Sequence, residues 1–307
     1  MRIVYMGTPD FAVPALKKLA SCERHTVAAV FTQPDKPQGR RQILTPPDVK
    51  VCAQELGIPV FRPVRMKGEE ALRALEELHP DVIVVAAYGQ ILPKAVIDLP
   101  KYGCVNIHGS LLPKYRGAAP IQQAVLDGET VTGVTTMLMD IGLDTGDILL
   151  AAETEIGGNE TSGELFDRLA VLGGELIVTT LDKLEKGEIT PCRQDESLAT
   201  HTSKIDKSRC LIDFTKPAAE VHNQIRGLSP WPVATALIGG RRLKIHASRL
   251  SSHSGIAGTV LSVKPLVIAC GEGAVELLEV QPEGKKRMSA EAFLAGHPLN
   301  VGQSVDG

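Results

Sequence analysis

Asn106-Ile107-His108-Gly109-Ser110-Leu111-Leu112-Pro113-Lys114-Tyr115-Arg116-Gly117 continues an apolar run and brings an amide and an imidazole to the end of a predicted strand. A second stretch, Asp140-Ile141-Gly142-Leu143-Asp144-Thr145-Gly146-Asp147, places the Asp144 carboxylate at the end of another. Together these three groups can bind an acyl oxygen and move a proton without a metal or a covalent intermediate. An isolated Asn-x-His pair is only a weak indication, because most histidines make ordinary structural hydrogen bonds.

Strand-like and helix-like runs alternate around these two stretches. The run 82–87 is wholly apolar, as is typical of a parallel strand buried on both faces. The pattern predicts an α/β fold with a Rossmann-like, doubly wound and mostly parallel sheet. Strands are expected at 2–7, 26–31, 59–61, 82–87, 103–107, 131–139 and 148–155, and helices at 10–20, 48–56, 68–78, 118–126 and 161–186.

The first strand–turn–helix unit does not predict a dinucleotide site. Its turn is Gly7-Thr8-Pro9-Asp10-Phe11-Ala12, and only Gly7 fits the Gly-x-Gly-x-x-Gly pattern. Pro9 also lacks the backbone N–H that a pyrophosphate would need at that point. A nicotinamide cofactor is therefore not expected.

The two quoted stretches, with Gly133-Val134-Thr135 between them, resemble the 10-formyltetrahydrofolate-dependent formyltransferases. The resemblance implies that Asn106, His108 and Asp144 are catalytic. It also implies a folate site without a metal, lined by Ser110, Leu111, Leu112 and Pro113. The turn after the 82–87 strand reaches the same sheet edge, where backbone groups can face a ligand. We expect it to contribute to the folate site through Tyr88, Gly89, Gln90, Ile91 and Leu92.

The chemistry implied by this resemblance is acyl transfer between amines. A neutral amine attacks the formyl carbon, and the tetrahedral oxyanion needs donors that are already in place. Asn106 and protonated His108 are the expected donors. Asp144 would favour the imidazolium and assist removal of a proton from the amine, and His108 could then protonate the leaving nitrogen. Asp144 could instead be a turn cap, and the two roles are compatible.

A polar segment at 33–48 is much longer than a normal strand–helix connection. It contains four prolines and a glycine, which we expect to prevent packed structure. It is either a passive surface loop or a basic arm that orders on a phosphate-rich partner, and we favour the arm. Its candidate RNA contacts are Lys36, Arg40 and Arg41.

Beyond residue 188 the helical periodicity ends. We expect a catalytic domain at 1–188, a linker at 189–208 and a second domain at 209–307. The linker and the start of the second domain carry Lys204, Lys207 and Arg209, which are candidate RNA contacts. The second domain is predicted to be a small OB-like β-barrel, with a helix at 216–226 and short strands at 234–238, 242–250, 258–262, 266–270 and 275–280.

Charge and further motifs indicate a macromolecular substrate. Residues 201–307 carry 13 basic against 9 acidic residues, and the rest of the chain carries 20 against 27. Ser229-Pro230-Trp231-Pro232 and Gln281-Pro282-Glu283-Gly284-Lys285-Lys286 resemble the branch of the family that formylates methionine on initiator tRNA. The alternatives are a formyltransferase for a sugar amine or glycinamide ribonucleotide, and a non-catalytic RNA-binding protein.

Composition is ordinary for a globular protein, with 43% hydrophobic and 22% charged residues. No uncharged apolar run has the roughly 18 residues of a membrane span, and the chain begins directly with a strand. We therefore expect a cytoplasmic protein that needs neither a membrane nor an obligate protein partner. The six cysteines form no Cys-x-x-Cys pair, so we expect reduced, mostly buried thiols.

Overall fold

The computed structural model describes residues 1–39 and 41–306, without the side chain of Gln38. The chain divides into two compact units, and each unit consists of three segments. The first unit comprises Met1–Gly117, Gly133–Thr154 and Phe166–His201. The second comprises Ala118–Thr132, Glu155–Leu165 and the chain from Thr202 onward.

The first unit is built on a seven-stranded sheet with the order β10-β9-β7-β6-β1-β2-β5. Strands β5, β2, β1, β6 and β7 run parallel to one another, and β9 is antiparallel to β7. The mostly parallel α/β sheet that the sequence predicts is therefore confirmed. The strands are β1 (Arg2–Gly7), β2 (Thr26–Phe31), β5 (Val60–Phe61), β6 (Val82–Ala86), β7 (Cys104–His108), β9 (Val131–Leu138) and β10 (Ile148–Glu155).

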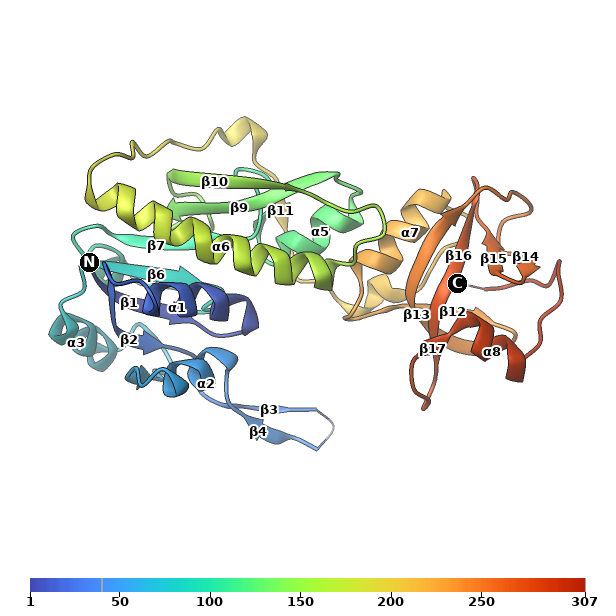
Figure 1. Cartoon of the computed structure of the whole chain (residues 1–307), viewed down its shortest axis with the longest axis horizontal. Helices are drawn as coiled ribbons and strands as arrows, with labels where there is room; N and C mark the ends of the chain where they lie inside the picture. Colours follow the sequence, from blue (N-terminus) through green and yellow to red (C-terminus); the bar gives the residue numbers. More distant parts are fainter. Residues whose placement is uncertain (40, 307) are drawn as a thin grey trace. The chain divides into compact units, whose positions relative to one another are not determined.

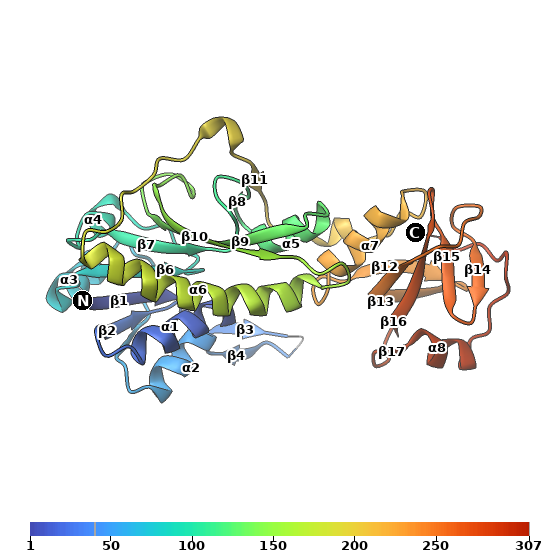
Figure 2. The same ribbon diagram turned by 45° about the horizontal axis from the view of Figure 1, so that its top comes forward.

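Helices cover both faces of this sheet (Figures 1 and 2). On one face, Gly173 of α6 (Ser162–Glu185) lies against Ile107, and Gly174 lies against α1 (Val13–Ala20) at Pro14. On the other face, α3 (Glu69–Leu78) and α4 (Lys94–Ile97) join Val4, Met6, Ile83 and Val85 in one buried cluster. Because helices cover both faces, β6 is buried along its whole length, and its sequence is correspondingly apolar throughout. The short η1 (Asp10–Ala12) and α2 (Asp48–Glu55) complete this part of the chain.

The 33–48 segment forms a hairpin, so our expectation that prolines and glycine would prevent packed structure is wrong. Strand β3 (Lys36–Gln38) pairs antiparallel with β4 (Ile43–Thr45). A two-stranded ribbon tolerates Pro37, because each strand has one edge that needs no ladder hydrogen bond. At the base of the hairpin, the Asp35 carboxylate lies 2.7 Å from Nζ of Lys50 and 3.5 Å from Arg62.

The second unit is built on a mainly antiparallel sheet with the order β12-β13-β16-β15-β14, and β17 also pairs with β16. Helix α7 (Ala218–Gly227) packs on β13. A further helix that was not predicted, α8 (Ala290–Gly296), packs on β16. Val221, Ile225, Ile245, Val280 and Phe293 belong to its core. The strands are β12 (Ala234–Ile238), β13 (Arg241–Ser251), β14 (Val260–Val263), β15 (Leu266–Ala269), β16 (Ala274–Pro282) and β17 (Met288–Ser289).

The segment that we expected to be a linker makes ordered contacts. Cys192 pairs with Ile148 beside β10, and Gln194 is buried. The short strands β8 (Arg116–Gly117) and β11 (His201–Thr202) also pair. The 3-10 turns η2 (Glu196–Leu198) and η3 (Lys207–Cys210) lie in the same region, and α5 (Pro120–Leu126) follows β8.

Two further observations concern membrane-spanning helices and the cysteines. Within the described part of the chain, no helix has both the length and the apolar character that a membrane crossing requires. The six cysteines carry free thiols, and four of them are buried.

Candidate active site

The site is centred on the carboxyl end of β7, which carries Asn106 and His108. Successive residues of a strand point to opposite faces. Because Ile107 faces α6, Asn106 and His108 lie on the other face together with Cys104. Both residues are more than 90% buried. The Asn106 amide makes no hydrogen bond to any residue in the described ranges, which leaves its N–H groups available to a ligand.

His108 is held in one tautomer by the chain that follows it. Its Nε2 lies 2.9 Å from the carbonyl oxygen of Tyr115. A carbonyl can only accept, so Nε2 carries the hydrogen and Nδ1 is the nitrogen that can gain or lose a proton. Nδ1 lies 3.7 Å from Oδ2 of Asp144. The imidazole and the carboxylate expected from the sequence are therefore brought together.

Asp144 follows β9 and adopts a left-handed backbone conformation, with φ +55°. Its Oδ2 accepts a hydrogen bond of 2.8 Å from the Gly117 N–H. The local turn is closed by another residue, because Asp140 Oδ1 accepts from the Gly142 N–H and from the Thr145 hydroxyl. The Asp144 carboxylate is therefore not used to close its own turn, and it points toward the Gly117 N–H and His108.

The residues Tyr115, Arg116 and Gly117 form a strap beside both side chains. The Tyr115 carbonyl contacts His108, and the Gly117 N–H contacts Asp144. The strap is anchored on Thr200, whose carbonyl accepts from the Arg116 N–H and whose hydroxyl accepts from the Tyr115 N–H, both at 2.8 Å. One short backbone segment therefore sets the positions of the imidazole and the carboxylate together.

The Ser110–Pro113 segment is held by Thr135, which lies opposite His108 on β9. The Thr135 hydroxyl donates to the Ser110 carbonyl at 2.7 Å and accepts from the Leu112 N–H at 3.1 Å. Leu111 packs on Gly133, where an added Cβ would lie 2.6 Å from Cδ2 of Leu111 and 2.1 Å from the Ala152 carbonyl. Glycine at 133 is therefore required for this segment to sit close to the sheet, with Pro113 after a cis peptide bond.

The Tyr88–Leu92 turn follows β6 at the same edge, but most of its side chains are already engaged. Tyr88 and Leu92 point into the core, and burial raises the pKa of the Tyr88 phenol. The Gln90 amide bonds to the backbone of Pro63 and Met66. Ile91 is 80% exposed. Gly89 has φ +74° and lies under the Gln33 side chain. Contacts from this turn to a ligand would therefore come from its backbone and from Ile91.

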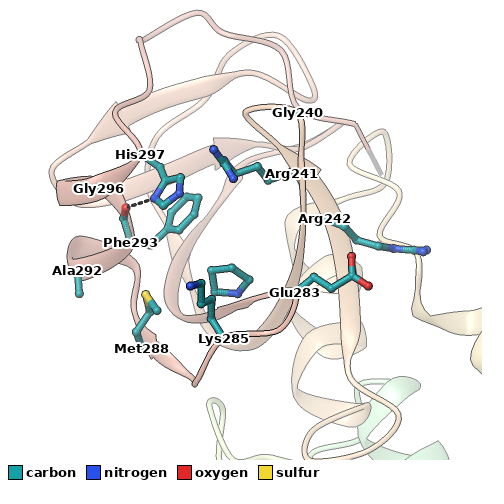
Figure 3. A pocket seen from close by; sticks show the side chains of 11 residues that line it. Gly240, Arg241, Arg242, Glu283, Lys285, Met288, Ala292, Phe293, Gly296 and His297 are labelled. Atoms are coloured by element: carbon teal, nitrogen blue, oxygen red, sulfur yellow. Dashed lines mark hydrogen bonds between the residues drawn. The ribbon is translucent and has the colours of Figure 1, made fainter.

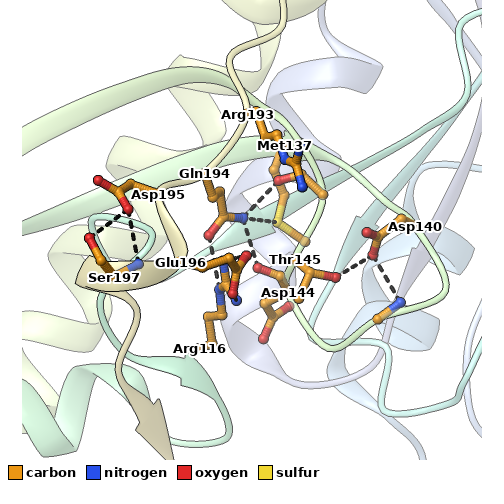
Figure 4. A network of polar contacts seen from close by, with 12 residues as sticks. Arg116, Met137, Asp140, Asp144, Thr145, Arg193, Gln194, Asp195, Glu196 and Ser197 are labelled. Carbon is orange, nitrogen blue, oxygen red and sulfur yellow. Dashed lines mark hydrogen bonds and ion pairs between the residues drawn. The ribbon is translucent and has the colours of Figure 1, made fainter.

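A polar network beside Asp144, in which Arg116 and Gln194 are buried and Glu196 is exposed, was missed by sequence reasoning (Figure 4). Arg116 is 1% exposed and forms a two-pronged ion pair with Glu196, at 2.8 and 2.9 Å. This hydrogen-bonded pair lowers the pKa of Glu196. The Arg116 Nε–H donates to Oε1 of Gln194 at 3.0 Å. Arg116 stood in the quoted motif, but Gln194 and Glu196 lie in a stretch without periodicity, where no sequence pattern marked them.

The predicted RNA-contacting residues are distributed over both units. In the first unit, Lys36 and Arg41 are exposed on the β3–β4 hairpin, and Lys36 bonds to Gln33. Arg40 lies outside the described residues. In the second unit, Lys204, Lys207 and Arg209 are exposed, and Arg209 donates to Oε1 of Gln123 at 2.9 Å.

The second unit also contains a cavity of about 520 Å³ between the β12–β13 turn, the segment after β16 and the end of α8 (Figure 3). The His297 ring stacks on Phe293 with ring centroids 4.8 Å apart. Figure 3 shows the side chains of Arg241 and His297 on the same side of the cavity. The charged side chains of its lining are Arg241, Arg242 and Lys285, with Glu283 as the single carboxylate in the described lining.

Two family models match the chain. The model described as "Formyl transferase" matches residues 1–181, and "Formyl transferase, C-terminal domain" matches residues 204–298. The chain is 48% identical over 304 residues to a protein of Citrifermentans bemidjiense named methionyl-tRNA formyltransferase, covering 98% of this chain and 95% of that protein. A protein of the same name from Trichlorobacter lovleyi is 49% identical, covering 98% and 96%.

Solved structures share the fold at lower identity. The sugar 3N-formyl transferase WlaRD, solved with dTDP and 5-N-formyl-THF, has a TM-score of 0.69 at 22% identity, covering 93% of this chain and 99% of that one. The N-formyltransferase of Helicobacter canadensis, with folinic acid and dTDP-3-aminofucose, has a TM-score of 0.68 at 21% identity, covering 90% and 98%. At these identities the likeness concerns the fold alone.

Proposed function

The chain belongs to the formyl transferase family, and on that basis we propose that it transfers the formyl group of 10-formyltetrahydrofolate to the α-amino group of methionine on initiator tRNA. The proposal is supported by relatives of 45–49% identity along nearly the whole chain that carry the name methionyl-tRNA formyltransferase. The observation that carries the chemistry is the meeting of His108 and Asp144 beside the free amide of Asn106.

The residues at the sheet edge fit a folate that donates a formyl group. The Asn106 amide is nearly buried and has no partner among the described residues, as expected for a group reserved for a ligand. Ile91 offers an exposed apolar side chain at the same edge. Ser110–Pro113 and the backbone of Tyr88–Leu92 would hold the folate, which supplies the formyl carbon that the amine attacks.

The side chains have separate tasks in this reaction. The Asn106 amide donates to the formyl oxygen as negative charge develops there. The Nδ1 atom of His108 delivers a proton to the folate nitrogen as its bond to the formyl carbon breaks, since Nε2 is committed to Tyr115. Asp144 stabilises the protonated imidazole and helps to take a proton from the attacking amine. The distance of 3.7 Å between Nδ1 of His108 and Oδ2 of Asp144 is longer than a hydrogen bond. A bound amine or water that contacts both atoms would therefore carry the proton between them.

The tRNA would be held by parts outside this centre. The hairpin carries Lys36 and Arg41 on an ordered ribbon whose base is fixed by Asp35. Lys204, Lys207 and Arg209 add positive charge in the second unit. In this proposal residues 1–188 form the catalytic domain, 189–208 connect it to 209–307, and the last part is an OB-like tRNA-binding domain in a cytoplasmic enzyme.

The cation-lined cavity of the second unit is a further candidate for RNA contact. Arg241 and Lys285 present charged donors to one space, and His297 presents a ring that is already stacked on Phe293. Guanidinium and ammonium groups bind phosphate oxygens, and an aromatic ring can stack on an exposed base.

Formylation of charged initiator tRNA, compared with elongator tRNA carrying the same methionine, tests this function. We expect fast formyl transfer to the initiator tRNA and much slower transfer to the elongator. Transfer to a nucleotide-linked sugar amine or to glycinamide ribonucleotide, with none to charged tRNA, would place the chain in another branch of the family. RNA binding without any formyl transfer would identify a non-catalytic binding protein.

A further inference from the structure

One side-chain amide bridges the turn that carries Asp144. Nε2 of Gln194 donates to the Asp144 carbonyl at 2.8 Å and to the Gly146 carbonyl at 2.7 Å. Both N–H groups of the amide are thereby used. Gln194 is 4% exposed, so these hydrogen bonds are shielded from water and from competing donors.

The turn that carries Asp144 needs these hydrogen bonds from Gln194 at the end where Asp144 lies. Its far end is fixed by β9, where the Leu138 N–H donates to the Asp147 carbonyl at 2.9 Å and Gly146 lies tightly against Leu138. Its near end contains Asp144 at φ +55°, a conformation that costs a non-glycine residue of order 1 kcal/mol or more. Without a fixed carbonyl at residue 144, its carboxylate could rotate away from Gly117 and His108.

Arg116 sets the direction of the Gln194 amide. Its Nε–H donates to Oε1, so the oxygen must face Arg116 and the nitrogen must face the turn. Arg116 is in turn held by the two oxygens of Glu196. Arg116 also lies between Tyr115 and Gly117, whose backbone groups contact His108 and Asp144. Gln194 thus joins the strap to the turn.

We propose that Gln194 is a positioning residue, which holds Asp144 in the orientation that presents its carboxylate to His108. This inference rests on the proposed function for its catalytic readout but not for its structural one. Gln194 touches neither His108 nor the Asp144 carboxylate; it acts through the two carbonyls of the turn. Its removal should therefore impair turnover more than substrate binding.

Two variants of Gln194 test this. Gln194→Leu removes the amide at similar size, and Gln194→Glu retains an acceptor for Arg116 but has no donor for the two carbonyls. We expect each to lower kcat by about tenfold to a hundredfold, the range for displacement of a catalytic group by roughly 1 Å, with little change in KM. The matched control is Gln122→Leu in the second unit, which removes an amide that bridges the Trp231 and Gly227 carbonyls at 2.8 and 3.5 Å. Its kcat should be unchanged.

A double-mutant cycle with Asp144→Asn separates positioning from a general structural role. If Gln194 acts through Asp144, then Gln194→Leu should cost little further activity in the Asp144→Asn background. Multiplicative losses in the double variant, or near-normal kcat in both Gln194 variants, overturn the proposal. A fall in thermal stability without a selective fall in kcat also overturns it.

Hydrogen exchange measured without substrate tests the position of Asp144 independently of the proposed function. The Gly117 N–H donates to the Asp144 carboxylate, so its hydrogen exchange reports where that carboxylate lies. We expect faster exchange of this amide in Gln194→Leu and Gln194→Glu, but not in Gln122→Leu. Unchanged exchange would refute the positioning role. Faster exchange in a protein that does not formylate charged tRNA would mean that only the proposed function fails.

Discussion

Nδ1 of His108 and Oδ2 of Asp144 face each other across 3.7 Å, although His108 ends β7 and Asp144 lies in the turn after β9. Each is held by a hydrogen bond to the strap: Nε2 of His108 donates to the Tyr115 carbonyl, and the Asp144 carboxylate accepts from the Gly117 N–H. The two groups are thus close enough to interact electrostatically but too far apart for a direct hydrogen bond. A proton passes between them only through a bound group or water.

Replacement of His108 by alanine should remove the proton carrier. We expect His108→Ala to lower kcat by about two to four orders of magnitude, the range for a general acid–base group, while the KM values for folate and tRNA change little. Steady-state kinetics with charged initiator tRNA measures this. Near-normal turnover would mean that the imidazole serves only to hold the Tyr115 carbonyl.

Replacement of Asn106 tests the donor role of its free amide. Asn106→Ala should reduce kcat by about 10²–10³, as expected for loss of one donor to a developing oxyanion. Asn106→Asp keeps the size of the side chain but removes the donor, so it should be at least as slow. Equal activity of the Asp variant and the wild type would contradict this role.

The hairpin should contribute to RNA binding through charge. We expect the double variant Lys36→Ala/Arg41→Ala to weaken tRNA binding and to reduce the slope of log K against log salt by up to about one unit per lost phosphate contact. Arg73→Ala on α3 is the control, since Arg73 is an exposed cation paired with Glu69 in the same unit. Equal slopes for the two variants would mean that the hairpin is passive.

The cavity of the second unit can be tested in the same way. Arg241→Ala/Lys285→Ala should weaken tRNA binding and lower its salt dependence, while formyl-folate binding stays the same. Lys264→Ala, at the turn between β14 and β15, removes a cation of the same unit outside this cavity. Titrations at several salt concentrations distinguish them. A greater loss in Lys264→Ala would exclude the cavity.

Acid should destabilise the second unit through buried histidines. Burial lowers the pKa of His222, which contacts the Ser248 hydroxyl and the Gly158 carbonyl, and burial also lowers the pKa of His246. Between the lowered folded-state pKa and the unfolded value of about 6.5, the unfolded chain binds more protons, so stability falls as pH falls. Thermal unfolding at pH 7.5 and 5.5 should show this fall, and His222→Gln should reduce it. An identical fall in that variant would assign the effect to other groups.

Local patterns in the sequence predicted the first sheet and named His108 and Asp144 as candidate site residues. The apolar run of β6 and the motif that begins in β7 are local patterns. The approach of Asp144 to His108 is not local, because β9 is antiparallel to β7 and ends beside Val105, and only the turn after β9 brings Asp144 to 3.7 Å from His108. Gln194 could not be found in this way, because its role depends on a contact with a residue 50 positions earlier in the chain. The hairpin was misjudged because composition does not show that Lys50 and Arg62 hold Asp35 at its base.

The chain passes between the two units five times, and this limits how the protein can be divided. Helix α5 belongs to the second unit, where Leu126 packs against Gly227 of α7, although α5 is encoded far upstream of α7. A gene fragment that ends before α7 would therefore produce α5 without the helix that covers it. Gene fusion or recombination can exchange such units only together, because each one is encoded in three separate stretches.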